Sequence, residues 1–179
     1  MQHSHSLDAL GERICILGPS NSGKSTLAAA IGRRRALNVI HLDQLHHLPG
    51  TDWVPRPADE FAALHGGAIM GDRWVIDGNY TRLMPQRFAR ATGVILLDAS
   101  TGLSLWRYVR RAWFETDRVG NLEGGQDSVK WAMLHHIAVR TRDNRRRYAA
   151  LLDVLELPTV RLTSARLIES FYQRESLDR

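Results

Sequence analysis

A stretch near the start of the chain, Gly18 to Ser25, restricts the possible folds more than any other feature. Its sequence, G-P-S-N-S-G-K-S, has glycine, lysine and serine at the spacing of a phosphate-binding loop. It follows an apolar run, Arg13 to Leu17, and precedes a helix-favouring run from Thr26, which is the strand, loop and helix order that such a loop requires. In this motif backbone N–H groups hold phosphate, Lys24 reaches the outer phosphates and Ser25 holds Mg²⁺. The residues expected to bind a nucleotide are Gly18, Pro19, Ser20, Asn21, Ser22, Gly23, Lys24, Ser25 and Thr26.

The length and composition predict one globular domain over residues 1–179, because a chain of this length that is 44% hydrophobic can bury one core. The net charge is +5, and of the 24 basic residues all but Lys24 and Lys130 are arginine. Arginine forms paired hydrogen bonds with phosphate, so the bias fits a nucleotide or nucleic-acid partner. A biased genome composition would give the same excess, and the two interpretations stay open.

The rest of the composition favours a cytoplasmic protein. The single Cys15 allows no disulfide within the chain, which suits a reducing compartment. No apolar run reaches the length of a membrane span, and the first seven residues lack the pattern of a signal peptide, so no membrane partner is expected. Residues 1–10 are expected to form a flexible tail.

Apolar runs and helix-favouring runs alternate along the whole chain. The expected strands are 13–17, 38–42, 73–77, 94–98 and 158–162, and the expected helices begin at 26 and cover 57–70, 103–115, 128–155 and 164–173, the last capped by Ser164. This alternation predicts an α/β fold in which a parallel sheet is covered by helices on both faces.

Three of the expected strands end with an aspartate. Asp43 comes just past the second strand, Asp77 ends the third and Asp98 ends the fourth. The carboxyl ends of parallel strands meet at one edge, where ligands bind in open α/β sheets, so these acids should face the same space as Lys24.

Three histidines close to Asp43 in sequence require separate consideration. His41, His46 and His47 could hold zinc together with Asp43, or they could fill the wall of a pocket. The second interpretation is favoured.

Arginines are concentrated after the fourth strand. The spacing of Arg107, Arg110 and Arg111 puts them on one side of the helix expected at 103–115. The glycine-containing segment at about 116–127, which includes Arg118, is expected to form a lid. A further basic block at 140–147 fits either a solvated helical face or a surface that contacts a ligand or nucleic acid.

With these motifs in hand, the chain resembles the small adenylate-kinase-like P-loop proteins, and within them the DNA topology modulation (FlaR-like) group. The resemblance rests on the phosphate-binding loop, on His41-Leu-Asp43, on Asp77-Gly-Asn-Tyr80 and on Val94 to Asp98. It implies a five-stranded parallel sheet in the order 2-3-1-4-5, with a small arginine-bearing lid after the fourth strand. It departs from the usual D-G-F-P-R of nucleoside monophosphate kinases, because Arg82 is displaced by one residue.

The resemblance also implies roles for single residues. Lys24 and Ser25 would bind the nucleotide phosphates and Mg²⁺, Asp77 would orient the metal and Asp43 would face the acceptor. The expected activity is a Mg²⁺-dependent transfer of the ATP γ-phosphate to a small acceptor of unknown identity. The residues expected to act in catalysis are Lys24, Asp43, Arg110, Arg111 and Arg118. The alternatives are a nucleotide-binding regulatory ATPase with a basic face that contacts nucleic acid, which lacks a supporting DNA-binding motif, and an ATPase without an acceptor.

Overall fold

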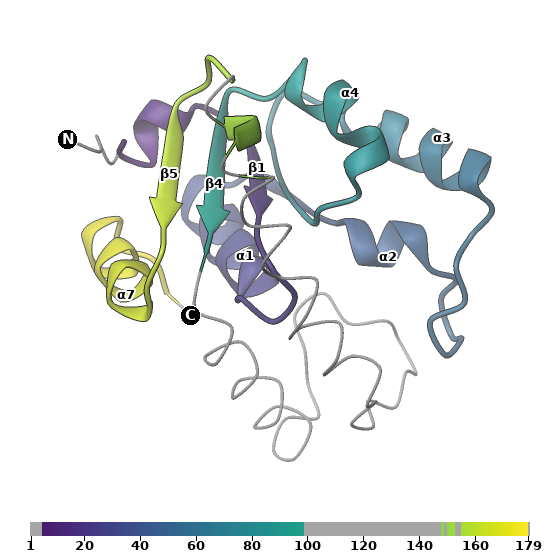
Figure 1. Cartoon of the computed structure of the whole chain (residues 1–179), viewed down its shortest axis with the longest axis horizontal. Coiled ribbons are helices and arrows are strands. Elements are labelled where there is room, and N and C mark those ends of the chain that lie inside the picture. The colour runs from purple at the N-terminus through teal and green to yellow at the C-terminus, as the bar shows by residue number, and fades with distance from the viewer. Residues whose placement is uncertain (1–4, 99–147, 149, 153–154, 179) are drawn as a thin grey trace.

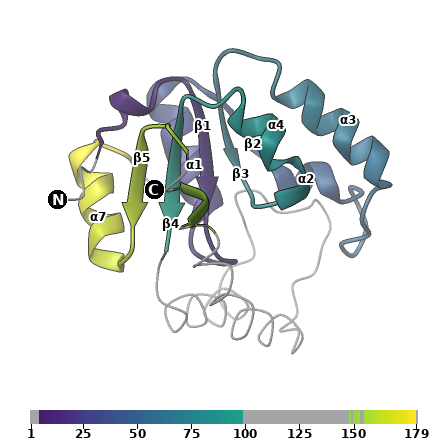
Figure 2. The same cartoon turned by 45° about the horizontal axis from the view of Figure 1, so that its top comes forward.

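The computed structural model describes residues 5–98, 148, 150–152 and 155–178. Its centre is a parallel sheet whose strands are β1 (Arg13–Leu17), β2 (Asn38–His41), β3 (Trp74–Asp77), β4 (Gly93–Leu97) and β5 (Thr159–Leu162). The strands lie in the order β2-β3-β1-β4-β5, and all point the same way (Figure 2). The α/β class, the parallel sheet and the strand order expected above are therefore confirmed.

Helices precede, connect and follow these strands. They are η1 (Asp8–Leu10), α1 (Lys24–Arg35), α2 (Leu42–His46), α3 (Ala58–Ala68), η2 (Thr81–Leu83), α4 (Met84–Phe88) and α7 (Ala165–Arg174). The expected cap of the last helix is confirmed, because the Ser164 hydroxyl accepts a hydrogen bond from the backbone N–H of Leu167 at 3.2 Å. Within the described ranges, no helix combines the length and the apolar character that crossing a bilayer requires.

Some expected elements fall outside the described residues. These are the helix at 103–115, the lid at about 116–127, and most of the helix at 128–155, of which Tyr148 and residues 150–152 are described as helical.

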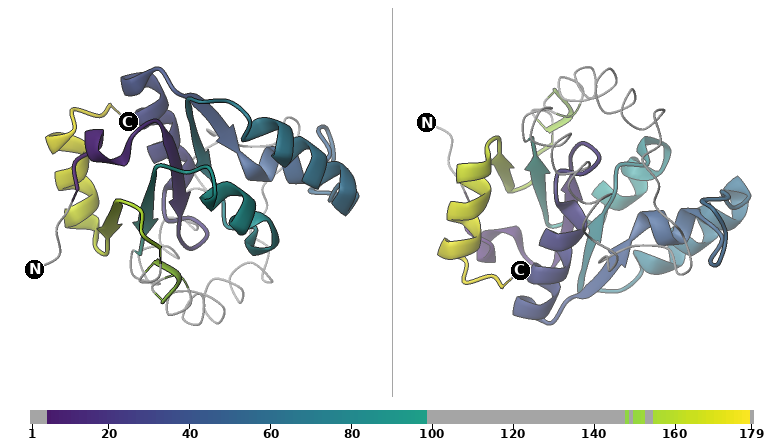
Figure 3. Two further views of the ribbon diagram at one scale, coloured as in Figure 1. Left: turned by 90° about the horizontal axis from the view of Figure 1, so that it is seen from above. Right: turned by 90° about the horizontal axis from the view of Figure 1, so that it is seen from below.

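Apolar side chains cover both faces of the sheet. On one face, Ile14 and Ile16 of β1 pack in a cluster with residues of α1, α7 and η1. On the other face, Cys15 and Leu17 pack in a cluster that includes Met84 of α4. Figure 3 shows α7 and α4 on opposite sides of the sheet, and Figure 1 shows α3 at the far end of the molecule from α7. Alternate residues of β1 thus face opposite layers, as a buried parallel strand requires.

The segment before β1 differs from the flexible tail expected over residues 1–10. Leu7 and Leu10 are buried in the core cluster beside β1. The backbone N–H of Leu7 donates to Glu175 Oε2 at 3.2 Å, and Arg35 donates to the Leu7 carbonyl oxygen at the same distance. Residues 7–10 are therefore part of the folded domain, because their two leucines complete the cover of one sheet face.

The structure also contains short helices that the sequence pattern did not predict. Asp43 lies in the first turn of α2 rather than in a loop after the second strand. Between β3 and β4 the chain forms η2 and α4, which is five residues long and begins with Pro85 in its first turn. Elements of this length are too short to show a helical repeat of apolar residues.

Two helix glycines allow a matched test of the packing around α1. A Cβ atom on Gly32 would lie 2.2 Å from Val39 Cγ2, whereas one on Gly66 in α3 would meet nothing within 4 Å. Gly66→Ala should raise the free energy of unfolding by about 0.5–1 kcal/mol, because alanine favours the helix. Gly32→Ala should lower it by about 1–3 kcal/mol, because the β-branched Val39 has little freedom to move away. Urea unfolding checks both values, and equal stabilisation by the two variants would contradict the described contact of α1 with β2.

His65 of α3 makes stability depend on pH. Its side chain is fully buried, and burial together with the charge of Arg87 lowers the pKa of His65 to about 4. Between pH 6.5 and 4 the unfolded chain therefore binds a proton at His65 that the folded protein does not bind, so stability falls as the pH is lowered. We expect His65→Phe to remove about 1–2 kcal/mol of the loss between pH 7 and pH 5. Denaturant titrations at the two pH values test this, and an unchanged pH dependence would show that the His65 imidazole is not held neutral.

Candidate functional site

The phosphate-binding loop connects β1 to α1 in a conformation that depends on its glycines. Gly18 has φ 146°, and a Cβ atom there would lie 2.3 Å from the Leu97 carbonyl oxygen. Gly23 has φ 95° and is the N-cap of α1, a helix of twelve residues whose positive end therefore faces the loop. Lys24 Nζ donates to the Pro19 carbonyl oxygen at 2.8 Å, so the side chain lies back over the loop. This geometry can hold a phosphate.

A hydrogen-bonded chain joins the loop to the neighbouring strands. Ser25 Oγ donates to Asp77 Oδ2 at 2.5 Å, and His41 Nδ1 lies 2.8 Å from Asp77 Oδ1. The sheet register explains this contact, because Asp77 of β3 pairs with His41 of β2 on one side and with Ile16 of β1 on the other. Asp77 is almost fully buried, at 4% exposure. His41 is therefore a partner of Asp77, a role that the sequence analysis did not give it.

The donor atoms at Ser25 and Asp77 fit Mg²⁺. A serine hydroxyl and a carboxylate are hard oxygen ligands, and Mg²⁺ is usually held by one or two such protein ligands together with phosphate oxygens. Throughout the part of the chain that the structure describes, no three side chains of His, Cys, Asp or Glu are grouped as a metal site. His41, His46 and His47 therefore do not form a zinc site with Asp43.

The turn after β3 also contacts the phosphate-binding loop through Asn79. The Gly18 N–H donates to Asn79 Oδ1 at 3.2 Å, and Asn79 Nδ2 donates to the Gly18 carbonyl oxygen at 2.9 Å. Arg87 of α4 donates to the carbonyl oxygens of Gly78 and Asn79, at 3.0 and 2.5 Å. Neither Asn79 nor Arg87 was a predicted site residue.

Asp43 is joined to the same turn by Tyr80. The Tyr80 hydroxyl donates to Asp43 Oδ1 at 2.6 Å, although Asp43 itself is exposed. Burial, reinforced by the nearby charge of Asp43, raises the pKa of the Tyr80 phenol, so this group stays a hydrogen-bond donor at neutral pH. The rings of His46 and Phe61 lie against Tyr80, with centroids 4.8 and 5.0 Å away. Asp43 is thus next to an aromatic cluster and is oriented by the half-buried side chain of Tyr80.

His46 belongs to this cluster as a mainly neutral side chain. Its ring lies edge-on to Phe61, and His46 Nδ1 is 3.2 Å from His47 Nε2. Partial burial, followed by the nearby His47, lowers the pKa of His46. The imidazole therefore packs as an aromatic ring at neutral pH.

Several predicted site residues fall outside the described residues. These are Arg110, Arg111 and Arg118, which were expected to act in catalysis, together with Arg107 and the basic block at 140–147. Their positions relative to Lys24 and Asp43 stay predictions.

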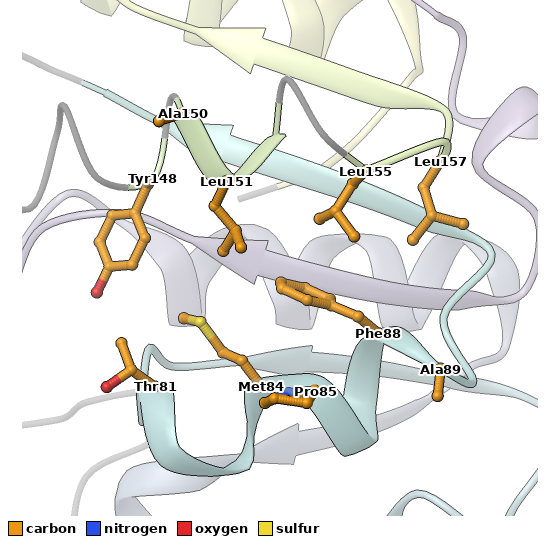
Figure 4. Close-up of a pocket in the computed structure, with 10 residues that line it drawn as sticks. All are labelled: Thr81, Met84, Pro85, Phe88, Ala89, Tyr148, Ala150, Leu151, Leu155 and Leu157. Atoms are coloured by element: carbon orange, nitrogen blue, oxygen red, sulfur yellow. The ribbon is translucent and has the colours of Figure 1, made fainter.

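An apolar pocket lies on the α4 face of the sheet (Figure 4). Met84 and Phe88 of α4 line one wall, and Leu151, Leu155 and Leu157 line the other. None of the predicted nucleotide, metal or acceptor residues lines it. The candidate site is therefore the polar group of side chains at the carboxyl edge of the sheet, and not this pocket.

Comparisons with known proteins bear on the fold. No protein-family model matches the chain, and no curated protein matches its sequence significantly. It is similar to the structure of a gluconokinase from Sinorhizobium meliloti 1021, with 18% identity and a TM-score of 0.56 over 94% of this chain and 90% of that one. The chain is also similar to a shikimate kinase from Bacteroides thetaiotaomicron, with 17% identity and a TM-score of 0.57 over 91% of this chain and 95% of that one. A shikimate kinase from Acinetobacter baumannii in complex with shikimate has 13% identity and a TM-score of 0.53, over 91% of this chain and 90% of that one.

The fold is accordingly that of the P-loop kinases. At these identities the likeness concerns the arrangement of strands and helices alone, so the chemistry has to be argued from the site.

The contact between His41 and Asp77 can be tested through stability. His41→Leu would leave a buried carboxylate oxygen without this partner, and should lower the free energy of unfolding by about 1–3 kcal/mol. His41→Asn keeps an N–H donor at a similar distance from the backbone and should recover a large part of that loss. Urea unfolding at pH 7.5 measures both variants. Equal stability of His41→Leu and the parent would mean that Asp77 does not depend on this imidazole.

Proposed function

We propose that the protein is a Mg²⁺-dependent phosphotransferase that moves the γ-phosphate of ATP to a hydroxyl group of a small acceptor. One observation carries the proposal: the turn Asp77 to Tyr80 contacts both halves of such a site. Asp77 accepts a hydrogen bond from Ser25 of the phosphate-binding loop, and Tyr80 donates one to Asp43. One short segment therefore joins the phosphate-binding loop to the carboxylate that would face the acceptor.

On the nucleotide side, the chain would act by position and charge. The loop N–H groups and the positive end of α1 would bind the phosphates, and Lys24 would exchange its bond with the Pro19 carbonyl for one with a phosphate oxygen. Ser25 and Asp77 would hold Mg²⁺, which neutralises phosphate charge when bound. We assign neutralisation of the transferring group also to Arg110, Arg111 and Arg118, from the sequence alone.

On the acceptor side, Asp43 would orient the attacking hydroxyl and take its proton as the new O–P bond forms and the bond to ADP breaks. Because Tyr80 fixes one carboxylate oxygen, the carboxylate would meet the acceptor in one orientation. The similar structures are named for gluconate and shikimate, which are hydroxy acids. This supports a hydroxyl-bearing acceptor. The resemblance to the adenylate-kinase-like and FlaR-like proteins adds nucleoside monophosphates as candidates, which would accept the group on a phosphate oxygen instead of a hydroxyl.

The test is a screen for transfer from ATP to nucleoside monophosphates, nucleosides, sugars and hydroxy acids, with the phosphorylated product detected by mass spectrometry. With the acceptor found, Asp43→Asn should lower kcat by about 100-fold or more while leaving the MgADP dissociation constant unchanged. Tyr80→Phe should lower kcat by about tenfold, because Asp43 remains but is no longer oriented. Lys24→Ala should weaken nucleotide binding and lower transfer together.

Two outcomes would refute the proposal. One is that no acceptor in the screen increases ADP formation above the rate that the protein gives without an acceptor, which would instead support an ATPase. The other is that Lys24→Ala binds MgADP as tightly as the parent, which would mean that the loop does not hold the phosphates.

A further inference from the structure

Arg87 is the only basic residue of α4, and its side chain is turned inward. It is fully buried, with 0% exposure, and its guanidinium donates to the carbonyl oxygens of Gly78 and Asn79. It lies in neither half of the proposed site. The inference drawn from it rests on the proposed function.

Burying a guanidinium is unfavourable unless its charge is compensated by hydrogen bonds or an ion pair. Within the described residues, Arg87 forms no ion pair with a carboxylate, so the two carbonyl oxygens are its main polar partners. Burial lowers the pKa of Arg87, yet an arginine side chain keeps its proton at neutral pH. The two hydrogen bonds are therefore charge-assisted and stronger than ordinary ones, and they hold the planes of two successive peptide groups.

Those two peptide groups determine where the turn points its side chains. Gly78 has φ 123°, which residues with a Cβ rarely adopt, and a Cβ there would lie 2.9 Å from Leu42. Tyr80 has φ 31° and ψ 66°, a left-handed conformation that is strained for tyrosine and has to be held by its surroundings. A turn with these dihedral angles would relax without outside support. The support comes from Arg87 behind it and from β1 beside it, where the Gly78 N–H donates to the Ile16 carbonyl oxygen.

We propose that Arg87 is a positioning residue for both halves of the site. By fixing the carbonyl groups of Gly78 and Asn79, it holds the Asn79 side chain against Gly18 of the phosphate-binding loop. Through the same turn it holds Tyr80 against Asp43. Loss of Arg87 should thus weaken nucleotide binding although the residue touches no nucleotide.

The competing explanation is that Arg87 only ties α4 to the sheet. Arg90, three residues further along, provides a matched control. It also donates to two backbone carbonyl oxygens, those of Ile69 and Met70, at 2.6 and 3.0 Å, but these follow helix α3 and are not part of the turn. Removing Arg90 therefore removes two bonds of the same kind, together with an ion pair to the exposed Asp72 at 3.8 Å, without affecting Asn79 or Tyr80.

The experiment compares Arg87→Met, Arg87→Lys and Arg90→Met. The dissociation constant of MgADP is measured by calorimetry at 15 °C, with far-UV circular dichroism and urea unfolding on the same samples. We expect Arg87→Met to bind MgADP about tenfold more weakly and Arg87→Lys, which keeps the charge but not both bonds, to fall in between. Arg90→Met should lose stability but bind MgADP within about twofold of the parent.

Asn79→Ala keeps the test decisive where Arg87→Met fails to fold. If Arg87 acts through Asn79, the combined effect of Arg87→Lys and Asn79→Ala on MgADP binding should be clearly smaller than the product of the two single effects. Independent effects, or parent-like binding by a folded Arg87→Met, would overturn the inference. A parent protein that binds no MgADP would instead refute the proposed function itself.

Discussion

The pairing of β1 with β3 is the interaction on which the rest of the site depends. Its register places Ile16 opposite Asp77, so the phosphate-binding loop and the turn after β3 leave the sheet side by side at the same edge. From that register follow the contact between Ser25 and Asp77, and the paired hydrogen bonds between Asn79 and Gly18. A shift of one residue would turn Asp77 to the opposite face of the sheet and separate all of these groups.

The main features of the fold could be predicted because they have a repeating or local signal. Buried parallel strands appear as short apolar runs, and the loop before α1 has fixed residue types at fixed spacing. The strand order came from the resemblance to adenylate-kinase-like proteins and was confirmed. The flexible tail expected over residues 1–10 was wrong for residues 7–10. Leu7 and Leu10 form no apolar run of their own in the sequence, and they are buried in a cluster with residues of β1, α1 and α7.

The supporting residues of the site could not be predicted in the same way. Asn79 contacts a backbone group 61 residues earlier in the chain, and His41 contacts a side chain 36 residues later. Arg87 was one arginine among many in the sequence, and only its burial distinguishes it. Such roles depend on which carbonyl or carboxylate the fold brings near, and composition or spacing carries no sign of that. The D-G-N-Y motif was noticed as a resemblance, but the separate contacts of its four residues come from the structure.

The two aspartates of the site have opposite environments, and this difference supports different roles. Asp77 is almost fully buried between a serine hydroxyl and an imidazole, which suits a carboxylate that stays in place and faces a metal ion. Asp43 is exposed on a short helix and is held at one oxygen by Tyr80, which suits a group that meets a substrate arriving from solvent. Asp77 begins the four-residue turn, and Tyr80 at its end is hydrogen-bonded to Asp43, so a displacement of the turn would move both aspartates. The proposed transfer would require that relation, because it depends on donor and acceptor being aligned at the same moment.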